Sequence, residues 1–270
     1  MNSIRCGLIL ISCSTGFALA QSAYAADGTA AASLDWSQLQ VSVTGVDGNV
    51  PTVTFSDEYT SLSSSAYVPG EGSEYNTRSI YDWTSTLAAN AQATATTFAH
   101  ASASPLSFSA NAQSMEGNNG YSYWDNPSAS SSGSRSENFS FDGPGVLTVT
   151  VPYTLNITGG ETFDYWNSTS ASVYASAYFS GSNENGSFNS NSNASFSLSS
   201  YYENSPDSQS GTLVLGIFAA GPGSGSLSFN TSASLGSPSI IPEPESYAML
   251  LAGLGLIGMI VRRRSAGSVA

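Results

Sequence analysis

The chain has 270 residues, of which only 9% are charged, and its formal net charge is −13 at pH 7. It contains no lysine, and an acidic surface of this kind repels phosphate backbones, so nucleic acid is disfavoured as a partner. The length allows one sizeable domain or two small ones, each with a buried core.

Residues 1–25 have the features of a secretory signal peptide. Arg5 supplies a basic start, residues 8–20 form a short apolar run, and residues 23–25 are a small-x-small cleavage site. A retained anchor is the alternative, but the apolar run is short for a membrane span. Both cysteines of the chain lie in this segment, so the mature domain is expected to depend on burial and sheet hydrogen bonds instead of disulfides.

Residues 26–236 are predicted to form the exported domain. From Leu39 onward the dominant pattern places apolar side chains at every second position, as in antiparallel strands with one buried face. The clearest run is residues 147–157, where every odd position is apolar. Shorter runs of the same kind are residues 139–141, 173–179, 194–198 and 227–235. Turn signals rich in Gly, Pro, Asn and Asp separate them. The pattern predicts an all-β domain, an antiparallel β-sandwich of jelly-roll-like type.

Residues 87–112 are rich in alanine, which favours helix by propensity. The alanines nevertheless fall on odd positions from 89 to 103, and after Pro105 the apolar residues fall on even positions. This change of phase predicts two strands that meet at Pro105, with a helix as the alternative. Two other segments, residues 61–75 and 126–136, are rich in Ser and Gly and are predicted to be long flexible loops.

Few residues offer catalytic or metal-binding chemistry. His100 is the only histidine and no G-x-S-x-G motif is present, so we expect an ordinary side chain on an outer strand face. A zinc site is disfavoured because one histidine and no mature cysteine cannot form it. Calcium is a candidate ligand at the acidic loops 46–49 and 125–128, although neither matches a known calcium-binding motif. No other cofactor and no enzymatic activity are expected, although paired carboxylates for glycoside hydrolysis would meet only in three dimensions.

Three short stretches place a tryptophan beside Tyr or Asp: residues 80–85, 121–126 and 163–168. Flat rings can stack on the C–H groups of a sugar while nearby carboxylates and amides bind its hydroxyls. These stretches therefore form a candidate carbohydrate site. Its residues are Trp83, Tyr123, Trp124, Asp125, Tyr165 and Trp166. The alternative is that the rings fill the core or pair across strands.

The chain ends with a triplet, an apolar run and an arginine cluster. The residues that define these features are Pro242, Glu243, Pro244, Arg262, Arg263 and Arg264. Residues 247–264 are predicted to form a short membrane helix, whose apolar part of about 22 Å is shorter than the bilayer core. Residues 237–246 are then a linker and residues 265–270 a cytoplasmic tail. Because arginines stay in the cytoplasm, the residues before the helix are placed outside.

These three features, in this order, resemble the PEP-CTERM sorting signal. The resemblance implies recognition by an exosortase, a membrane protease or transpeptidase of Gram-negative bacteria that make exopolysaccharide, with processing near the triplet. The expected function is that of an exported, non-enzymatic surface or biofilm-matrix protein. It would be anchored in the inner membrane before processing and would then reach the outer surface or the medium. A carbohydrate-binding module or adhesin for exopolysaccharide is the first alternative, and a secreted glycosidase is the second.

Overall fold

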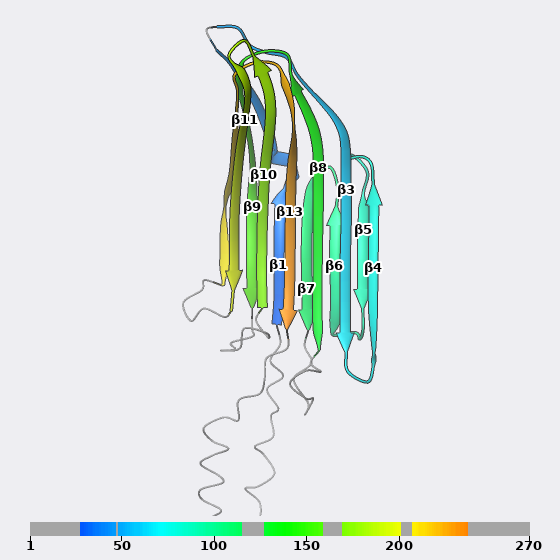
Figure 1. The fold of residues 1–270 in the computed structure, drawn as a ribbon. Coiled ribbons are helices and arrows are strands. Elements are labelled where there is room, and N and C mark those ends of the chain that lie inside the picture. Colours follow the sequence, from blue (N-terminus) through cyan, green and yellow to red (C-terminus); the bar gives the residue numbers. More distant parts are fainter. Residues whose placement is uncertain (1–27, 47, 115–126, 159–168, 201–206, 237–270) are drawn as a thin grey trace, which may run out of the picture. The chain divides into compact units, whose positions relative to one another are not determined.

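The computed structural model of this protein describes residues 28–46, 48–114, 127–158, 169–200 and 207–236. All of them belong to the first of two compact units, Met1–Pro238. They form two antiparallel sheets and one short 3-10 helix (Figure 1). None of the helical structure described is long and apolar enough to cross a bilayer. The predicted signal peptide and the predicted C-terminal helix lie outside the described residues.

The first sheet has seven strands, in the order β12-β9-β1-β7-β6-β5, and β2 is also paired with β9. The 3-10 helix η1 (Trp36–Gln38) joins β1 to β2. The strands of this sheet are β1 (Gly28–Asp35), β2 (Gln40–Gly45), β5 (Leu87–Gln92), β6 (Thr97–Ala103), β7 (Ser107–Ser114), β9 (Gly145–Thr158) and β12 (Ser208–Ala219).

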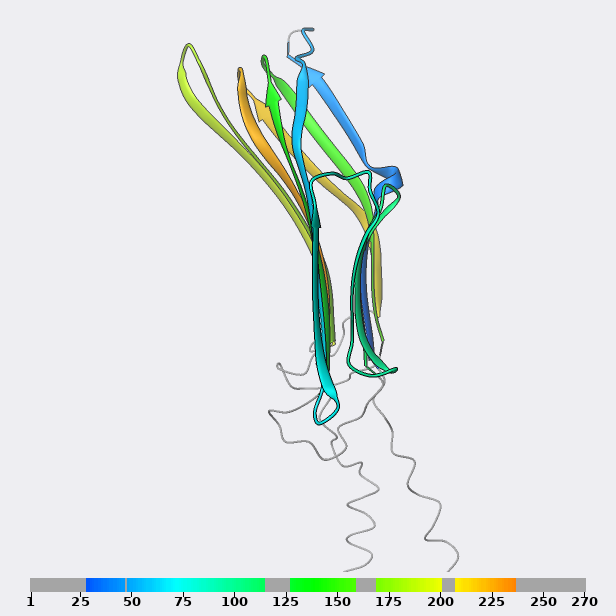
Figure 2. The same cartoon turned by 90° about the vertical axis from the view of Figure 1, so that its right-hand side faces the viewer.

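The second sheet has six strands, in the order β11-β10-β13-β8-β3-β4. Its strands are β3 (Val53–Val68), β4 (Gly72–Ile80), β8 (Ser128–Phe141), β10 (Thr169–Asn183), β11 (Gly186–Ser199) and β13 (Gly223–Gly236). Figure 2 shows the two sheets as facing layers. The prediction of an antiparallel two-sheet sandwich is therefore confirmed.

The core lies between the sheets and is built from alternate residues of each strand. In β9, for example, every odd residue from Leu147 to Ile157 is buried. The alanine-rich strands β5, β6 and β7 leave space that large rings fill. Trp36 contacts Trp83 and Phe229 in edge-to-face geometry, with ring centroids 5.1 Å apart in both pairs. Bulky rings thus compensate for a thin alanine layer.

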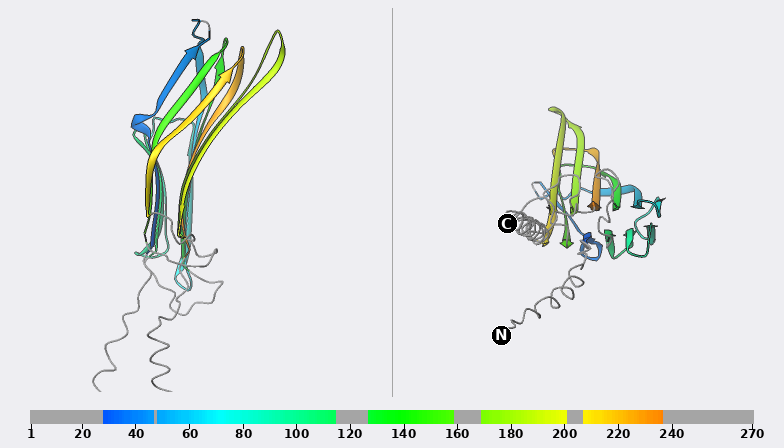
Figure 3. Two further views of the ribbon diagram at one scale, coloured as in Figure 1. Left: turned by 90° about the vertical axis from the view of Figure 1, so that its left-hand side faces the viewer. Right: turned by 90° about the horizontal axis from the view of Figure 1, so that it is seen from below.

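Side chains close the sandwich along both lateral edges. On the side seen in Figure 3 (left), β11 and β12 are edge strands of different sheets. The hydroxyls of Ser192 and Ser190 in β11 accept hydrogen bonds from the backbone N–H groups of Gly216 and Phe218 in β12, both at 3.2 Å. On the opposite side, the Glu74 carboxylate in β4 accepts the backbone N–H of Gln92 in β5 at 2.8 Å. Occupied edge groups are not available to pair with another chain.

The prediction of long loops at residues 61–75 and 126–136 is wrong. Most of the first segment belongs to the hairpin of β3 and β4, and most of the second belongs to β8. Serine occupies most of the outward positions of these strands, and several inward positions are also small. The inward side chains still bond across the sandwich: Ser64 donates to the Ala89 carbonyl and Ser131 to the Asn111 carbonyl, both at 2.8 Å. Hydrogen bonds thus replace apolar contacts in these strands.

The prediction of strands instead of a helix at residues 87–112 is confirmed, and the chain reverses at Ser104–Leu106 as expected. A second reversal at residues 93–96 divides the first of the two predicted strands into β5 and β6. Apolar residues occupy odd positions on both sides of that reversal, so the periodicity gave no sign of it.

Candidate functional site

The outer face of the six-stranded sheet has an unusually uniform composition. On β8, β10, β11 and β13 every outward position is Ser, Asn or Tyr, apart from the terminal Gly236. No charged side chain lies on this part of the face, although the whole chain carries a net charge of −13. Tyr174 and Tyr178 of β10 supply its large exposed rings. This face therefore offers hydroxyls, amides and ring surfaces in a neutral environment.

The strand register aligns these residues in rows across the sheet. One row consists of Asn191, Tyr178, Ser226, Asn138 and Ser56, each paired with the next on the neighbouring strand. The next row consists of Asn189, Ser180, Ser224, Ser140 and Thr54. Neighbouring groups within a row are separated by the strand spacing of about 4.8 Å. The two rows form a regular polar array.

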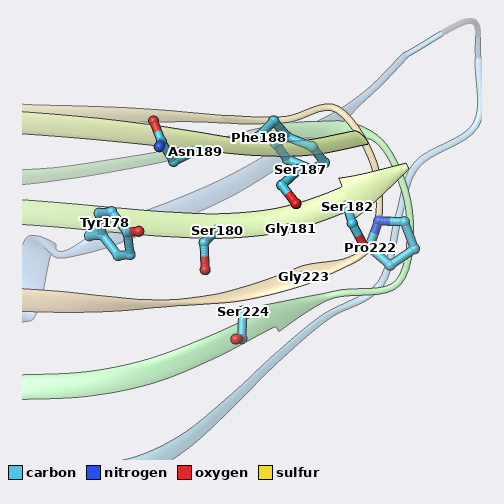
Figure 4. Close-up of a pocket in the computed structure, with 10 residues that line it drawn as sticks. All are labelled: Tyr178, Ser180, Gly181, Ser182, Ser187, Phe188, Asn189, Pro222, Gly223 and Ser224. Carbon is cyan, nitrogen blue, oxygen red and sulfur yellow. The ribbon is translucent and has the colours of Figure 1, made fainter. Parts of the chain in front are cut away.

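Two adjoining hollows lie over these two rows. Figure 4 shows the first, of about 550 Å³, near the ends of β10, β11 and β13 that adjoin Pro222. The second, of about 410 Å³, shares Tyr178, Ser180 and Ser224 with the first and extends across β13 and β8 to Ser56 of β3. We call these two hollows together the sheet trough. The trough crosses the strands and can accept an extended polar ligand.

A third hollow, of about 510 Å³, shares Ser56 with the trough. It lies at a bulge in β3 where the register with β8 shifts between Ser56 and Tyr59. Its other lining residues are Phe55, Asp57, Glu58, Tyr59, Tyr81 and Glu137. We call it the acidic hollow. Bulges commonly redirect side chains next to functional sites.

The backbone at the bulge is held in an uncommon conformation. Asp57 has a φ of 57°, in the left-handed region that few residues other than glycine adopt. Its Oδ2 accepts hydrogen bonds from the Asn138 amide at 3.1 Å and from the Ser56 hydroxyl at 3.2 Å. Glu58 Oε2 accepts the backbone N–H of Trp83 at 2.7 Å. These bonds fix two carboxylates at the rim of the hollow.

Two neighbouring residues of β8 are buried and ionisable. Arg135 is fully buried, and burial lowers the pKa of its guanidinium to about 10, against the opposing effects of Glu58 and Asp82. Glu137 is 9% exposed, and burial, followed by the charge of Glu58, raises the pKa of its carboxyl to about 7. Arg135 therefore stays charged at neutral pH, whereas Glu137 exchanges a proton there.

The structure places only one of the tryptophans proposed for carbohydrate binding. Trp83 is 9% exposed and packs against Trp36 and Phe229, and its Nε1 donates to the Tyr59 carbonyl at 3.2 Å. Its ring is not available to a sugar, so for Trp83 the alternative of core packing holds. The other proposed residues lie outside the described residues: Tyr123, Trp124, Asp125, Tyr165 and Trp166.

The remaining candidates contribute little to a site. His100 lies on the outer face of β6, where its ring bonds the side-chain oxygen of Asn90, as the outward position predicts. The aspartates of the two calcium-candidate loops, Asp47 and Asp125, lie outside the described residues. Within the residues described, no three His, Cys, Asp or Glu side chains are grouped so that they could hold a metal ion.

The trough and the acidic hollow were not predicted. The residues of the trough are mostly Ser, Asn and Tyr, which carry no motif for a binding site. The alternation of Ser or Asn with apolar residues in β10 and β13 was visible in the sequence. Only the strand order aligns these residues into a face.

Comparison with known families locates one functional segment. Residues 241–265 match the family described as "PEP-CTERM protein-sorting motif". The chain is a PEP-CTERM sorting domain-containing protein. The matched PEP-CTERM segment contains all the predicted sorting residues: Pro242, Glu243, Pro244, Arg262, Arg263 and Arg264. These residues lie outside the described part of the chain. The match supports an exported protein that an exosortase recognises.

Other comparisons add little about the PEP-CTERM protein. A search of curated proteins finds no match. One solved structure, described as "Structural basis for the promiscuous specificity of the carbohydrate-binding modules from the beta-sandwich super family", is 8% identical, with a TM-score of 0.11. The similarity covers 70% of this chain and 92% of that chain. A TM-score this low does not establish a shared fold.

Proposed function

We propose that this PEP-CTERM protein is an exported, non-enzymatic surface or matrix protein that contacts neutral exopolysaccharide through the sheet trough. The observation that carries the proposal is the uncharged rows of Ser, Asn and Tyr beneath two adjoining hollows. An anionic polysaccharide would be repelled by the net charge of the chain, whereas a neutral one would not.

The dimensions of the trough suit an extended glycan. Hydroxyl and amide groups repeat across the strands at about 4.8 Å, close to the length of one sugar unit. A chain lying along a row would therefore meet one polar group for each sugar. The Tyr178 ring, which is 51% exposed, lines both hollows and can stack on a sugar face.

Sorting would bring the protein to its ligand. The signal peptide would direct export, and the helix at residues 247–264 would hold the precursor in the inner membrane. An exosortase would then process the chain near Glu243 and transfer or release it. The mature protein would reach the outer surface or the extracellular matrix, where it could meet exopolysaccharide.

Affinity electrophoresis tests this proposal. The exported protein should be retarded in gels that contain neutral host polysaccharide, and Tyr178→Ala should lose most of the retardation. Phe218→Ala is the matched control, because Phe218 is 52% exposed but lies on the outer face of the other sheet. Equal mobility in gels with and without polysaccharide would leave a structural protein without a glycan ligand.

A glycosidase is the second candidate, and one observation favours it. Glu58 and Glu137 line the same hollow, and the raised pKa of Glu137 is the property required of a catalytic acid. We prefer binding without hydrolysis because no carboxylate lines the trough that would hold the glycan. Glu58 and Glu137 line the separate hollow at the β3 bulge. Release of reducing sugar that disappears in Glu137→Gln would establish hydrolysis instead.

A further inference from the structure

The acidic hollow contains a mostly buried glutamate whose carboxylate has no hydrogen-bond partner among the described residues. Glu137 is 9% exposed and lines the hollow, yet no hydrogen bond or ion pair reaches its carboxylate from any described residue. The neighbouring carboxylates differ in this respect. Asp57 is held by Asn138 and Ser56, and Glu58 is held by the Trp83 N–H. The Glu137 oxygens are open to the hollow, where a ligand that donates hydrogen bonds could replace water.

No cation among the described residues donates a hydrogen bond to the Glu137 or Asp57 carboxylate. The nearest is Arg135, whose Nη2 donates to the carbonyls of Trp83 and Ser104, at 3.3 and 3.1 Å. The charges of Glu58 and Asp82 stabilise its charged form. The other arginine in the described residues, Arg78, lies exposed on β4. Asp57, together with Glu137 in its ionised form, therefore leaves the hollow with an excess of negative charge.

Aromatic rings form another part of the lining. Tyr59 and Tyr81 contact each other with ring centroids 5.2 Å apart and planes inclined at 51°. Tyr81 is 83% exposed, so it presents ring surface to a ligand. The face of a tyrosine ring attracts a cation, and the ring packs against C–H groups. Carboxylates together with exposed rings are suited to an organic cation.

A metal ion is a poorer match for the same residues. Calcium prefers six to eight oxygen ligands in a compact shell. The described residues include no group of three or more carboxylate, imidazole or thiol side chains arranged to hold a metal. An ammonium group requires less, since one or two carboxylate acceptors and a ring face are enough.

We propose that the acidic hollow binds a primary ammonium group, supplied by a non-acetylated amino sugar. The ammonium would donate to the carboxylates of Glu137 and Asp57, while the sugar carbons pack against Tyr81. Ser56 lines both the hollow and the trough, so the two sites adjoin. The site goes beyond the proposed function, because a neutral glycan needs no carboxylate. The hollow can also bind an amine whether or not the trough binds a glycan.

Calorimetric titration of the exported protein tests the site with three probes. Glucosamine oligomers should bind, N-acetylglucosamine oligomers of equal length should bind at least tenfold more weakly, and 1,4-diaminobutane should bind through its ammonium groups alone. Tighter binding of the oligomers than of the diamine identifies a sugar as the source of the amine. The reverse order supports the ammonium site but assigns it to a free polyamine.

Two variants and one control locate the binding. Glu137→Gln keeps the shape of the side chain and should weaken glucosamine binding at least tenfold, and Tyr81→Ala, in an exposed connection, should weaken it severalfold. Glu71→Gln removes the same charge from the distant β3–β4 turn and should have no effect. Equal losses in Glu137→Gln and Glu71→Gln, or equal binding of acetylated and free oligomers, would overturn the proposal. Retardation by neutral polysaccharide, measured on the same samples, reports the trough separately.

Discussion

The guanidinium carbon of Arg135 lies 4.6 Å from the centroid of the Trp36 ring and 5.3 Å from that of Phe108. Arg135 belongs to the six-stranded sheet, whereas Phe108 belongs to the seven-stranded sheet and Trp36 to the 3-10 helix that follows β1. The two layers are therefore joined here by a cation over aromatic rings. Nε and Nη1 of Arg135 have no hydrogen-bond partner among the described residues, so part of the desolvation cost is not recovered.

Arg135→Ala should destabilise the domain by about 2–4 kcal/mol, because it removes a large buried side chain and leaves a cavity between the sheets. Arg135→Met should recover most of this loss, since it fills the space without unpaired N–H groups. Urea denaturation measures both. Arg78→Met, which removes the same charge from an exposed position, should change stability by less than about 0.5 kcal/mol. A similar cost in Arg78→Met would contradict the importance of the buried contact.

Glu137→Gln should stabilise the protein at pH 8 by on the order of 1–3 kcal/mol and have little effect near pH 4. Burial and Glu58 raise the pKa of this carboxyl from 4.5 to about 7, so the folded protein binds the proton more tightly than the unfolded chain. That contribution is complete below about pH 4.5 and is lost as the pH rises through about 7. Unfolding curves from pH 4 to 8 measure the difference between variant and parent. If the stability of the variant and of the parent depends on pH in the same way, the raised pKa of Glu137 is refuted. Glu71→Gln serves as the charge control.

Gly133→Ala should cost about 1–3 kcal/mol, because a Cβ at this position would lie 2.5 Å from the Phe108 ring and 3.1 Å from Leu62. Gly216→Ala provides the control. Its Cβ would meet no atom within 4 Å, and the variant keeps the N–H that Ser192 accepts. Thermal unfolding of both variants compares them directly. If Gly133→Ala leaves the thermal stability unchanged, the facing Phe108 ring moves more easily than its burial implies.

Glu243→Ala should cause the unprocessed precursor to accumulate in the membrane, if the triplet is what the sorting enzyme reads. Intact-mass measurement of the protein from its native host should show a mature chain that lacks the residues from Tyr247 onward. Neutral replacements of Arg262, Arg263 and Arg264 should weaken retention of the tail before processing. A mature protein that still ends at Ala270 would indicate an ordinary membrane anchor.

The sequence predicted the strands that have a strongly apolar face. Residues 147–157 and 227–235 alternate large apolar residues with polar ones, and both lie within long strands, β9 and β13. The serine-rich parts of β3 and β8 were missed because their inward positions include Ser64, Ser131 and Gly133. Such small residues give no apolar signal of their own, and their burial depends on the opposite sheet.

The site could not be predicted, for a different reason. The trough exists because β13 lies between β8 and β10, an order that brings together residues from four separate parts of the chain. The acidic hollow depends on a bulge in β3 that no motif marks. The burial of Trp83 likewise depends on Trp36 and Phe229, which are distant in sequence. The sorting signal was predictable because its features are contiguous.

The burial of Arg135 also affects how long such a domain persists outside the cell. Trypsin-like proteases cleave after lysine or arginine, and between Asp27 and Ile241 the sequence contains only Arg78 and Arg135. Arg135 is inaccessible, and the backbone of Arg78 is paired with Leu62 in the hairpin of β3 and β4. Cleavage at either residue requires local unfolding, so the folded domain offers this large class of secreted enzymes almost nothing to digest.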